Sequence, residues 1–263
     1  MEKLAGTKKS SSSADRLLSI LELIANQPHG ISLAEVSKEL NIPKTTALRL
    51  LDKLVERGYV EYEKQTEKYS IGFETILLSM TALSKMEVVE KSIPYLKELS
   101  AVTKETTFLG VYYEGEIVYL YKSEGTQSMI INSQLGTRRP VHCTGLGKAI
   151  MSGFPIEHVT KVLMEKGMPK MTDNTITSVE DYLRELSDVR LNGYAFDNEE
   201  LEYGLGCIAA PVYNYTGKVV AAICVSGPIH RVKENKETLV KELKEAAMQI
   251  SRRMGFVPSM LVY

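Results

Sequence analysis

The sequence has few cysteines, and their number and spacing argue against two kinds of stabilising framework. Cys143, Cys207 and Cys224 are the only three in 263 residues. An odd number does not suit a set of paired disulfides, and none of the intervals matches a zinc-binding motif. His142 and these cysteines could bind zinc only if the fold gathered them, and buried cysteines that behave as small apolar side chains are much commoner. We therefore expect no metal and no other cofactor.

The chain also lacks a strong net charge and a long apolar run. Its formal net charge is −1 and its pI is about 6.5. Residues 1–72 carry eleven Lys/Arg and ten Asp/Glu, a net +1, and the remainder carries a net −2. Affinity for nucleic acid would therefore depend on where individual cations lie rather than on overall charge. No segment has the pattern of a signal peptide or an 18-residue membrane span, so we expect a cytoplasmic protein without a membrane partner.

Local catalytic motifs are missing as well. Gly145-Leu146-Gly147-Lys148 is rich in glycine, but its spacing matches neither phosphate-binding nor dinucleotide-binding loops. Neither G-x-S-x-G nor H-E-x-x-H occurs. A nucleophilic set of Cys207, His142 and Asp197 is conceivable, although nothing in the local spacing supports it.

The stretch Ile31–Tyr69 contains the most informative local pattern. Ser32 and Glu35 have the spacing of a capping box, which predicts a helix that ends before Asn41. Pro43 suits the first position of a second helix. We expect the inner face of this second helix to consist of apolar residues, namely Ala47, Leu48, Leu51, Leu54 and Val55. A preceding helix, Ala14–Gln27 capped by Ser13, would support the pair.

Cations and hydroxyls gather on the other side of the second helix, and a hairpin follows it. Strands Tyr59–Tyr62 and Lys68–Ile71 would flank a charged tip and so form a wing. A helix–turn–helix unit places the start of its second helix in the major groove of DNA. The alternative is an ordinary helical hairpin with solvated charges. The order of elements favours DNA binding, through Lys44, Thr45, Thr46, Arg49 and Lys53 on the helix and Lys64 and Lys68 on the wing.

Four segments are expected along the chain. Residues 1–12 are polar and predict a disordered arm. The other three segments are the winged domain at residues 13–72, a linker helix at residues 73–87 and the second domain at residues 88–256. The linker helix has an apolar stripe, which either caps its own domain or, as we favour, pairs with the same helix of a second subunit. Val88–Lys104 predicts another helix, in which Pro94 is tolerated only at a start or a kink.

The second domain changes character after Thr103. Segments rich in β-branched and aromatic residues predict antiparallel strands, interrupted by helices and closed by one long helix, Val232–Met254. The expected strands are 106–113, 116–122, 128–132, 193–196, 207–213 and 219–226, and the expected inserted helices are 144–153, 156–166 and 179–192. Together these segments predict an α+β domain on one antiparallel sheet.

The segment Gly193–Val212 combines an acidic cluster, 197–200, with a Gly204-x-Gly206 loop and a cysteine at the head of an apolar strand. An acidic cluster at the end of a strand is usually a solvated turn. Combined with the glycines and the cysteine, it is more typical of the mouth of a ligand pocket. Backbone amides of Gly145, Leu146 and Gly147 could donate to an anionic ligand there.

The whole chain resembles the IclR (isocitrate lyase regulator) family of transcription factors. The resemblance is carried by IPKTTALRLL (42–51), PVHCTGLGKAIMS (140–152), RLNGYAFDNEELEYGLGCIAAPV (190–212) and VVAAICVSGP (219–228), which occur in the family's order. A winged helix is shared by many families, whereas the C-terminal phrases are specific. The resemblance implies a winged helix–turn–helix, a linker helix and a GAF-like effector domain. It also implies a homodimer or a dimer of dimers whose binding to DNA responds to a small organic acid.

The resemblance implies the pocket residues as well, which are Gly145, Leu146, Asp197, Leu205, Cys207, Cys224 and Ser226. Cys224 departs from a family pattern of serine and replaces a good hydroxyl donor with a weak one. The CTGLGKA version of the loop looks most like regulators of sugar-acid breakdown, such as those that sense 2-keto-3-deoxygluconate.

The expected function is therefore that of a DNA-binding transcriptional regulator, a repressor, on a palindromic operator in double-stranded DNA. Its affinity would be modulated by a small organic acid. The alternatives are an enzyme that acts on a small acid through Asp197 and Cys207, and a metabolite sensor that works by protein contact alone.

Overall fold

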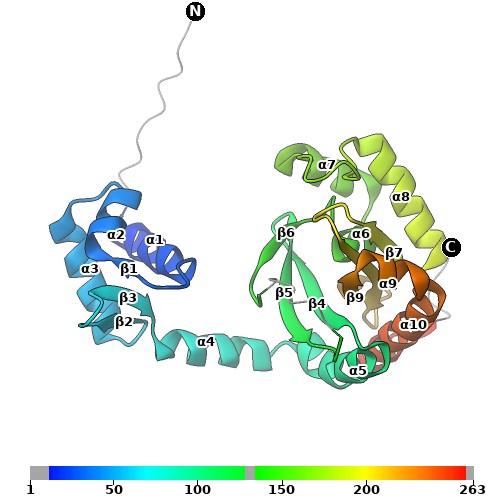
Figure 1. The fold of residues 1–263 in the computed structure, drawn as a ribbon, viewed down its shortest axis with the longest axis horizontal. Helices are drawn as coiled ribbons and strands as arrows, with labels where there is room; N and C mark the ends of the chain where they lie inside the picture. The colour runs from blue at the N-terminus through cyan, green and yellow to red at the C-terminus, as the bar shows by residue number, and fades with distance from the viewer. Residues whose placement is uncertain (1–11, 128–133, 259–263) are drawn as a thin grey trace, which may run out of the picture. The chain divides into compact units, whose positions relative to one another are not determined.

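The computed structural model describes residues 12–127 and 134–258, which form two units divided between Lys85 and Met86 (Figure 1). Most of the arm predicted for residues 1–12 and the strand predicted for 128–132 lie outside the described residues. No described helix is long and apolar enough to cross a membrane.

The first unit contains three helices, a small sheet and a fourth helix. In chain order they are α1 (Ser13–Ala25), β1 (Ile31–Ser32), α2 (Leu33–Glu39), α3 (Lys44–Glu56), β2 (Val60–Glu63), β3 (Lys68–Ile71) and α4 (Phe73–Ser84). The predicted helix–turn–helix and wing are confirmed. The sheet has the order β1-β3-β2, because the short strand β1 pairs with β3 of the wing. Strand β1 was not predicted.

Side-chain caps fix the start of two of these helices. The capping box of Ser32 and Glu35 is present at α2. A second one, of Ser12 and Asp15, starts α1 one residue before the predicted start, so Ser13 is not the cap. Each box satisfies amide groups that the first helical turn would otherwise leave unpaired.

The inner face of α3 differs from the predicted one. Ala47, Leu50, Leu51 and Leu54 are buried, whereas Leu48 is 41% exposed and Val55 is 36% exposed. Spacings of three, four and seven residues place the four buried side chains on one stripe. Leu48 and Val55 are seven residues apart on a neighbouring stripe, and they therefore lie outside the core.

Helix α4 begins against the wing and then has no core of its own. The amide of Glu74 donates to Gly58 O at 3.1 Å, and the Thr75 hydroxyl donates to Tyr59 O at 3.1 Å. Gly72 is needed here, because a Cβ would lie 2.3 Å from Gly58 O. The structure describes every residue of α4 and buries none, leaving an apolar surface of Phe73, Ile76, Leu77, Leu78 and Met80.

The second unit is an α+β domain on one antiparallel sheet, as predicted. Its strands are β4 (Thr106–Tyr113), β5 (Glu116–Ser123), β6 (Arg138–Pro140), β7 (Ala195–Asn198), β8 (Leu205–Tyr213) and β9 (Val219–Pro228). Their spatial order is β6-β5-β4-β9-β8-β7, so β9, the last strand of the sequence, lies inside the sheet between β4 and β8.

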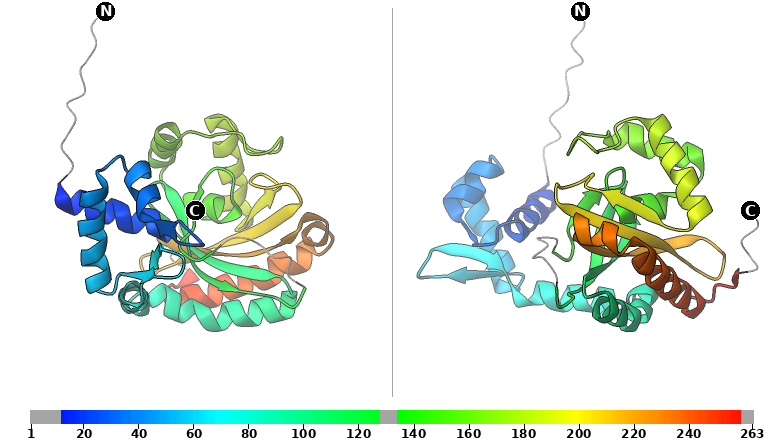
Figure 2. Two further views of the ribbon diagram at one scale, coloured as in Figure 1. Left: turned by 60° about the vertical axis from the view of Figure 1, so that its left-hand side comes forward. Right: turned by 45° about the vertical axis from the view of Figure 1, so that its right-hand side comes forward.

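Helices cover both faces of this sheet (Figure 2). They are α5 (Glu87–Thr103), α6 (Gly145–Met151), α7 (Ile156–Lys166), α8 (Val179–Asn192), α9 (Ile229–Glu234) and α10 (Lys236–Arg253). Helices α5 and α10 pack together on one face, whereas α6 packs on the other and is followed there by α7 and α8. The main core lies between the sheet and α6–α8.

Helix α5 does not start at Pro94 but continues through it, so of the two predicted alternatives only a kink there stays a prediction. Pro94 has no amide proton for the carbonyl of Glu90, and both residues are exposed, so water can satisfy that carbonyl. The prediction of one closing helix is wrong, because this helix is divided in two at Asn235. The Asn235 side chain donates to Arg231 O at 3.0 Å and so caps α9.

Candidate functional sites

The seven predicted pocket residues all line one cavity in the second unit, although they come from α6 and three strands. Register explains this convergence, because Asp197 lies opposite Cys207, Cys207 opposite Ser226, and Phe108 opposite Cys224. Alternate residues of neighbouring strands share one face. The remaining lining residues were not predicted, and they are Phe108, Tyr119, Arg139, Thr144, Leu201 and Glu202.

The cavity is small in this conformation. Its volume is about 30 Å³, which is space for about two water molecules. Leu201 and Glu202 line it from a loop in which Glu199 and Gly204 both have positive φ, and Leu205 lines it from the start of β8. The cavity as it stands is too small for a ligand as large as a sugar acid.

Helix α6 approaches the sheet closely, and a glycine makes this approach possible. A Cβ on Gly145 would lie 3.1 Å from Cys207 Sγ and 3.4 Å from the Ala209 Cβ. The amide of Gly147 donates to the Thr144 hydroxyl at 3.1 Å. This amide therefore caps its own helix, so the prediction that it donates to a ligand is wrong. For the amides of Gly145 and Leu146 it stays a prediction.

Asp197 is buried rather than solvated, with 5% of its surface exposed. Its Oδ1 accepts from the amide of Glu200 at 2.8 Å. Burial, followed by the nearby charge of Glu200, raises the pKa of Asp197 to about 7. The group is therefore a mixture of acid and carboxylate near neutral pH, and it can accept or donate a hydrogen bond.

Behind Asp197 lies a buried ionic network that was not predicted from the sequence. Lys148 is fully buried, and its Nζ lies 2.5 Å from Glu200 Oε1 and 2.9 Å from Glu185 Oε1. It also donates to Phe196 O in β7, the edge strand of the sheet. Burial alone would lower the pKa of Lys148, but Glu200 and Glu185 outweigh burial and raise it. The charged lysine thus ties α6 to α8 and β7.

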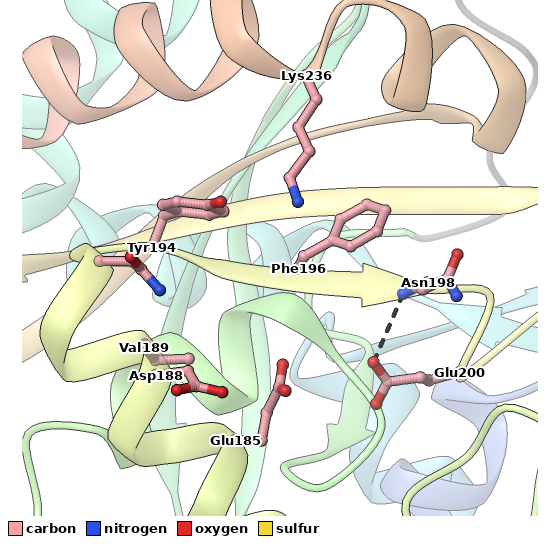
Figure 3. A pocket seen from close by; sticks show the side chains of 9 residues that line it. Glu185, Asp188, Val189, Tyr194, Phe196, Asn198, Glu200 and Lys236 are labelled. Atoms are coloured by element: carbon pink, nitrogen blue, oxygen red, sulfur yellow. Dashed lines mark hydrogen bonds between the residues drawn. The ribbon is translucent and has the colours of Figure 1, made fainter.

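A second cavity, of about 260 Å³, lies on the outer side of this network (Figure 3). The carboxylates of Glu185 and Glu200 face it from one side. From the other side Lys236 Nζ reaches the rings of Phe196, at 4.8 Å, and Tyr194, at 5.6 Å. The cation that pairs with Glu185 and Glu200 is Lys148, which lies behind this cavity and does not line it.

The cysteines are arranged as apolar side chains rather than as nucleophiles. Cys143, Cys207 and Cys224 are buried and unpaired by disulfides. The hydrogen bond that the Cys207 thiol donates to Cys224, together with burial, raises the pKa of Cys207 well above its ordinary value, and burial raises that of Cys143 to about 12. A nucleophilic cysteine needs the opposite shift. His142 Nε2 pairs with Pro169 O at 3.0 Å, and no metal-binding group of three or more such side chains gathers among the described residues.

In the first unit, the outer face of α3 presents most of the predicted DNA-contacting residues to solvent. Lys44, Thr45, Arg49 and Lys53 are exposed, and Thr46 is half-buried. Lys53 Nζ lies 2.6 Å from Glu56 Oε2, in an exposed pair that is weak enough to exchange for another anion. On the wing, Lys64 is exposed at the tip and Lys68 is half-buried opposite Glu63.

Comparison with known proteins agrees with this division of the chain. Residues 13–64 match the IclR helix-turn-helix domain and residues 80–252 match the bacterial transcriptional regulator IclR C-terminal domain. HTH-type transcriptional regulator KdgR of Dickeya chrysanthemi is 36% identical over 94% of this chain and 81% of its own length. The Escherichia coli regulator of that name is 34% identical over 94% of both chains. The crystal structure of a Thermotoga maritima IclR superposes with a TM-score of 0.79 at 30% identity, over 93% of this chain and 99% of that one.

These relatives are regulators that bind DNA, and they do not support the enzymatic alternative. The chain therefore belongs to the IclR family of bacterial transcriptional regulators, with a DNA-binding helix–turn–helix domain and an effector-binding C-terminal domain.

Proposed function

We propose that this regulator is a repressor whose affinity for a palindromic operator changes when a small organic acid enters the cavity beside Asp197. The observation that carries the proposal is the convergence of Gly145, Asp197, Cys207 and Ser226, from four separate elements, on one lined cavity. Such a regulator works where the chromosome is, in the cytoplasm.

For DNA recognition we propose that α3 enters the major groove and that the wing lies along the backbone. Lys44, Thr45, Thr46, Arg49 and Lys53 would then contact bases and phosphates, and Lys64 and Lys68 would contact the backbone near the wing. Leu48, which the fold leaves exposed, suits contact with a thymine methyl group.

For the effector we propose a small acid that also carries a hydroxyl or keto group. Asp197 would bind that group, since a half-protonated carboxyl can either accept or donate. Ser226, whose hydroxyl now donates to Gly206 O at 3.3 Å, would be a further donor. The wall of the cavity would be formed by Leu146, Leu205, Cys207 and Cys224. Because the thiol of Cys224 is a weak donor, we expect an effector that does not need a strong hydrogen-bond donor at this position.

For assembly we propose a homodimer, or a dimer of dimers, in which α4 pairs with its copy. The exposed apolar surface of this helix supports the proposal, because a monomer would leave it in water. The effector then acts by favouring one arrangement of the dimer over another, which changes the spacing of the two reading helices.

Footprinting on the DNA upstream of the regulator's own gene tests the DNA-binding part of this proposal. We expect protection of two inverted half-sites whose centres lie about 10 base pairs, or a multiple of that, apart. Uniform protection without half-sites would contradict the proposed palindrome.

A further inference from the structure

Two neighbouring arginines of β6 have opposite surroundings. The guanidinium of Arg138 lies 3.3 Å from Glu116 Oε2 and 3.6 Å from Glu114 Oε2, and stacks 5.2 Å from the ring centre of Tyr113. Successive side chains of a strand point to opposite faces. Arg139 therefore points the other way, and it lines the cavity that contains Asp197.

One donor of the Arg139 guanidinium has no acceptor in the described part of the chain. Its Nε is buried and makes no hydrogen bond within the residues that the structure describes. A guanidinium has five N–H donors and keeps its charge at all relevant pH values. A buried donor without an acceptor costs free energy, and a ligand that supplies an acceptor to this donor removes that cost.

Two acids line the cavity with Arg139, namely Asp197 and Glu202, and neither forms an ion pair with it among the described residues. The Oδ1 of Asp197 accepts from the amide of Glu200. The Thr144 hydroxyl donates to Pro140 O at 2.9 Å. Burial raises the pKa of Tyr119 well above its ordinary value, so that this phenol stays neutral.

We propose that Arg139 binds the carboxylate of the effector through a charge-assisted pair of hydrogen bonds and thereby restricts the site to acids. The carboxylate lies at the β6 side of the cavity, and the hydroxyl or keto group of the same molecule lies at the Asp197 and Ser226 side. The rings of Phe108 and Tyr119, whose centres are 5.1 Å apart, form part of the wall of the same cavity. The inference rests on the proposed effector function and specifies which side chain recognises the charge.

Calorimetry on the full-length protein tests this assignment. The probes are gluconate, pyruvate and 4-hydroxybenzoate, each beside its neutral carboxamide, together with 2-keto-3-deoxygluconate. For any acid that binds the unmodified protein, we expect Arg139→Met to weaken binding by about ten- to a hundredfold, the range for hydrogen bonds to a charged partner. Arg139→Lys, which keeps the charge without the fork, should weaken it by less.

Two controls separate contact from general electrostatics and from misfolding. Arg138→Met removes an equal charge from the next residue and should change affinity by less than about threefold, because its partners lie outside the cavity. The carboxamides should bind the unmodified protein and Arg139→Met equally weakly. Equal affinity of the acid for the unmodified protein and for Arg139→Met would overturn the assignment of Arg139 while the effector proposal stands. A loss of affinity in Arg138→Met as large as that in Arg139→Met would do the same. Failure of every acid to bind the unmodified protein would overturn both.

Discussion

Replacing Asp197 by asparagine removes one buried acid while it keeps an oxygen for the Glu200 amide. The pKa of Asp197 is about 7 in the folded chain and 3.8 in the reference state that represents the unfolded chain. A raised folded pKa contributes stability that is fully present below pH 3.8 and is lost as pH rises through 7. Ionisation of Asp197 therefore destabilises the folded protein in neutral and alkaline solution.

The size of the effect follows from the two pKa values. One pKa unit corresponds to 1.36 kcal/mol, so a shift from 3.8 to about 7 costs about 4 kcal/mol once the group is fully ionised. About 2.5 kcal/mol of this cost develops between pH 5 and pH 8. The stability of Asp197→Asn relative to the unmodified protein should rise by that amount over the same interval.

Urea unfolding of both proteins at pH 5 and pH 8 measures this difference directly. Asp188→Asn, an exposed acid on α8, is the matched control and should follow the unmodified protein at both pH values. Parallel pH dependence of Asp197→Asn and the unmodified protein, within about 0.5 kcal/mol, would show that Asp197 is already ionised at pH 5 and refute the reasoning.

Three further predictions concern other parts of the molecule. Lys148→Met should lower the free energy of unfolding by about 3–5 kcal/mol in a denaturant titration, since it leaves the buried Glu200 without its cation; a loss below about 1 kcal/mol would contradict the network. Arg49→Ala should lose roughly 1–3 kcal/mol of specific operator affinity. Lys64→Ala should weaken binding to all DNA sequences alike and make the slope of log affinity against log salt concentration shallower by about one. Unchanged operator binding by Arg49→Ala would contradict the placement of α3 in the major groove. Ile76→Asp with Met80→Asp should weaken dimerisation in sedimentation, and an intact dimer that binds the operator fully would show that α4 has another role.

Local signals were sufficient for much of the fold. Helices α7 and α8 have the predicted bounds. Ser178 caps the start of α8, and Gly167 and Gly193 end α7 and α8, so each signal lies next to the helix end that it sets. Strand β6 was missed because three residues are too few to show alternation. Asn235 divides the closing helix through a cap that helical periodicity does not reveal.

The site depended more on the fold than on local pattern. The family resemblance indicated the seven pocket residues, but only the strand register shows that they share one cavity. Arg139 was missed because its neighbour Arg138 carries the same charge and alternation alone cannot say which of the two faces inward. Lys148 could have been recognised, since a cation flanked by Leu146, Ala149, Ile150 and Met151 must be buried and needs a buried partner.

The central claim is that a small acid changes operator affinity, and fluorescence anisotropy with labelled DNA from upstream of the gene tests it most directly. The titration is run in constant salt, with and without each acid that binds in calorimetry, and against a scrambled duplex of equal length. We predict tight binding to the upstream DNA over the scrambled duplex, and a shift of at least tenfold in its dissociation constant when the acid saturates the protein. Equal affinity for both duplexes, or an unchanged dissociation constant with saturating acid, would contradict the account.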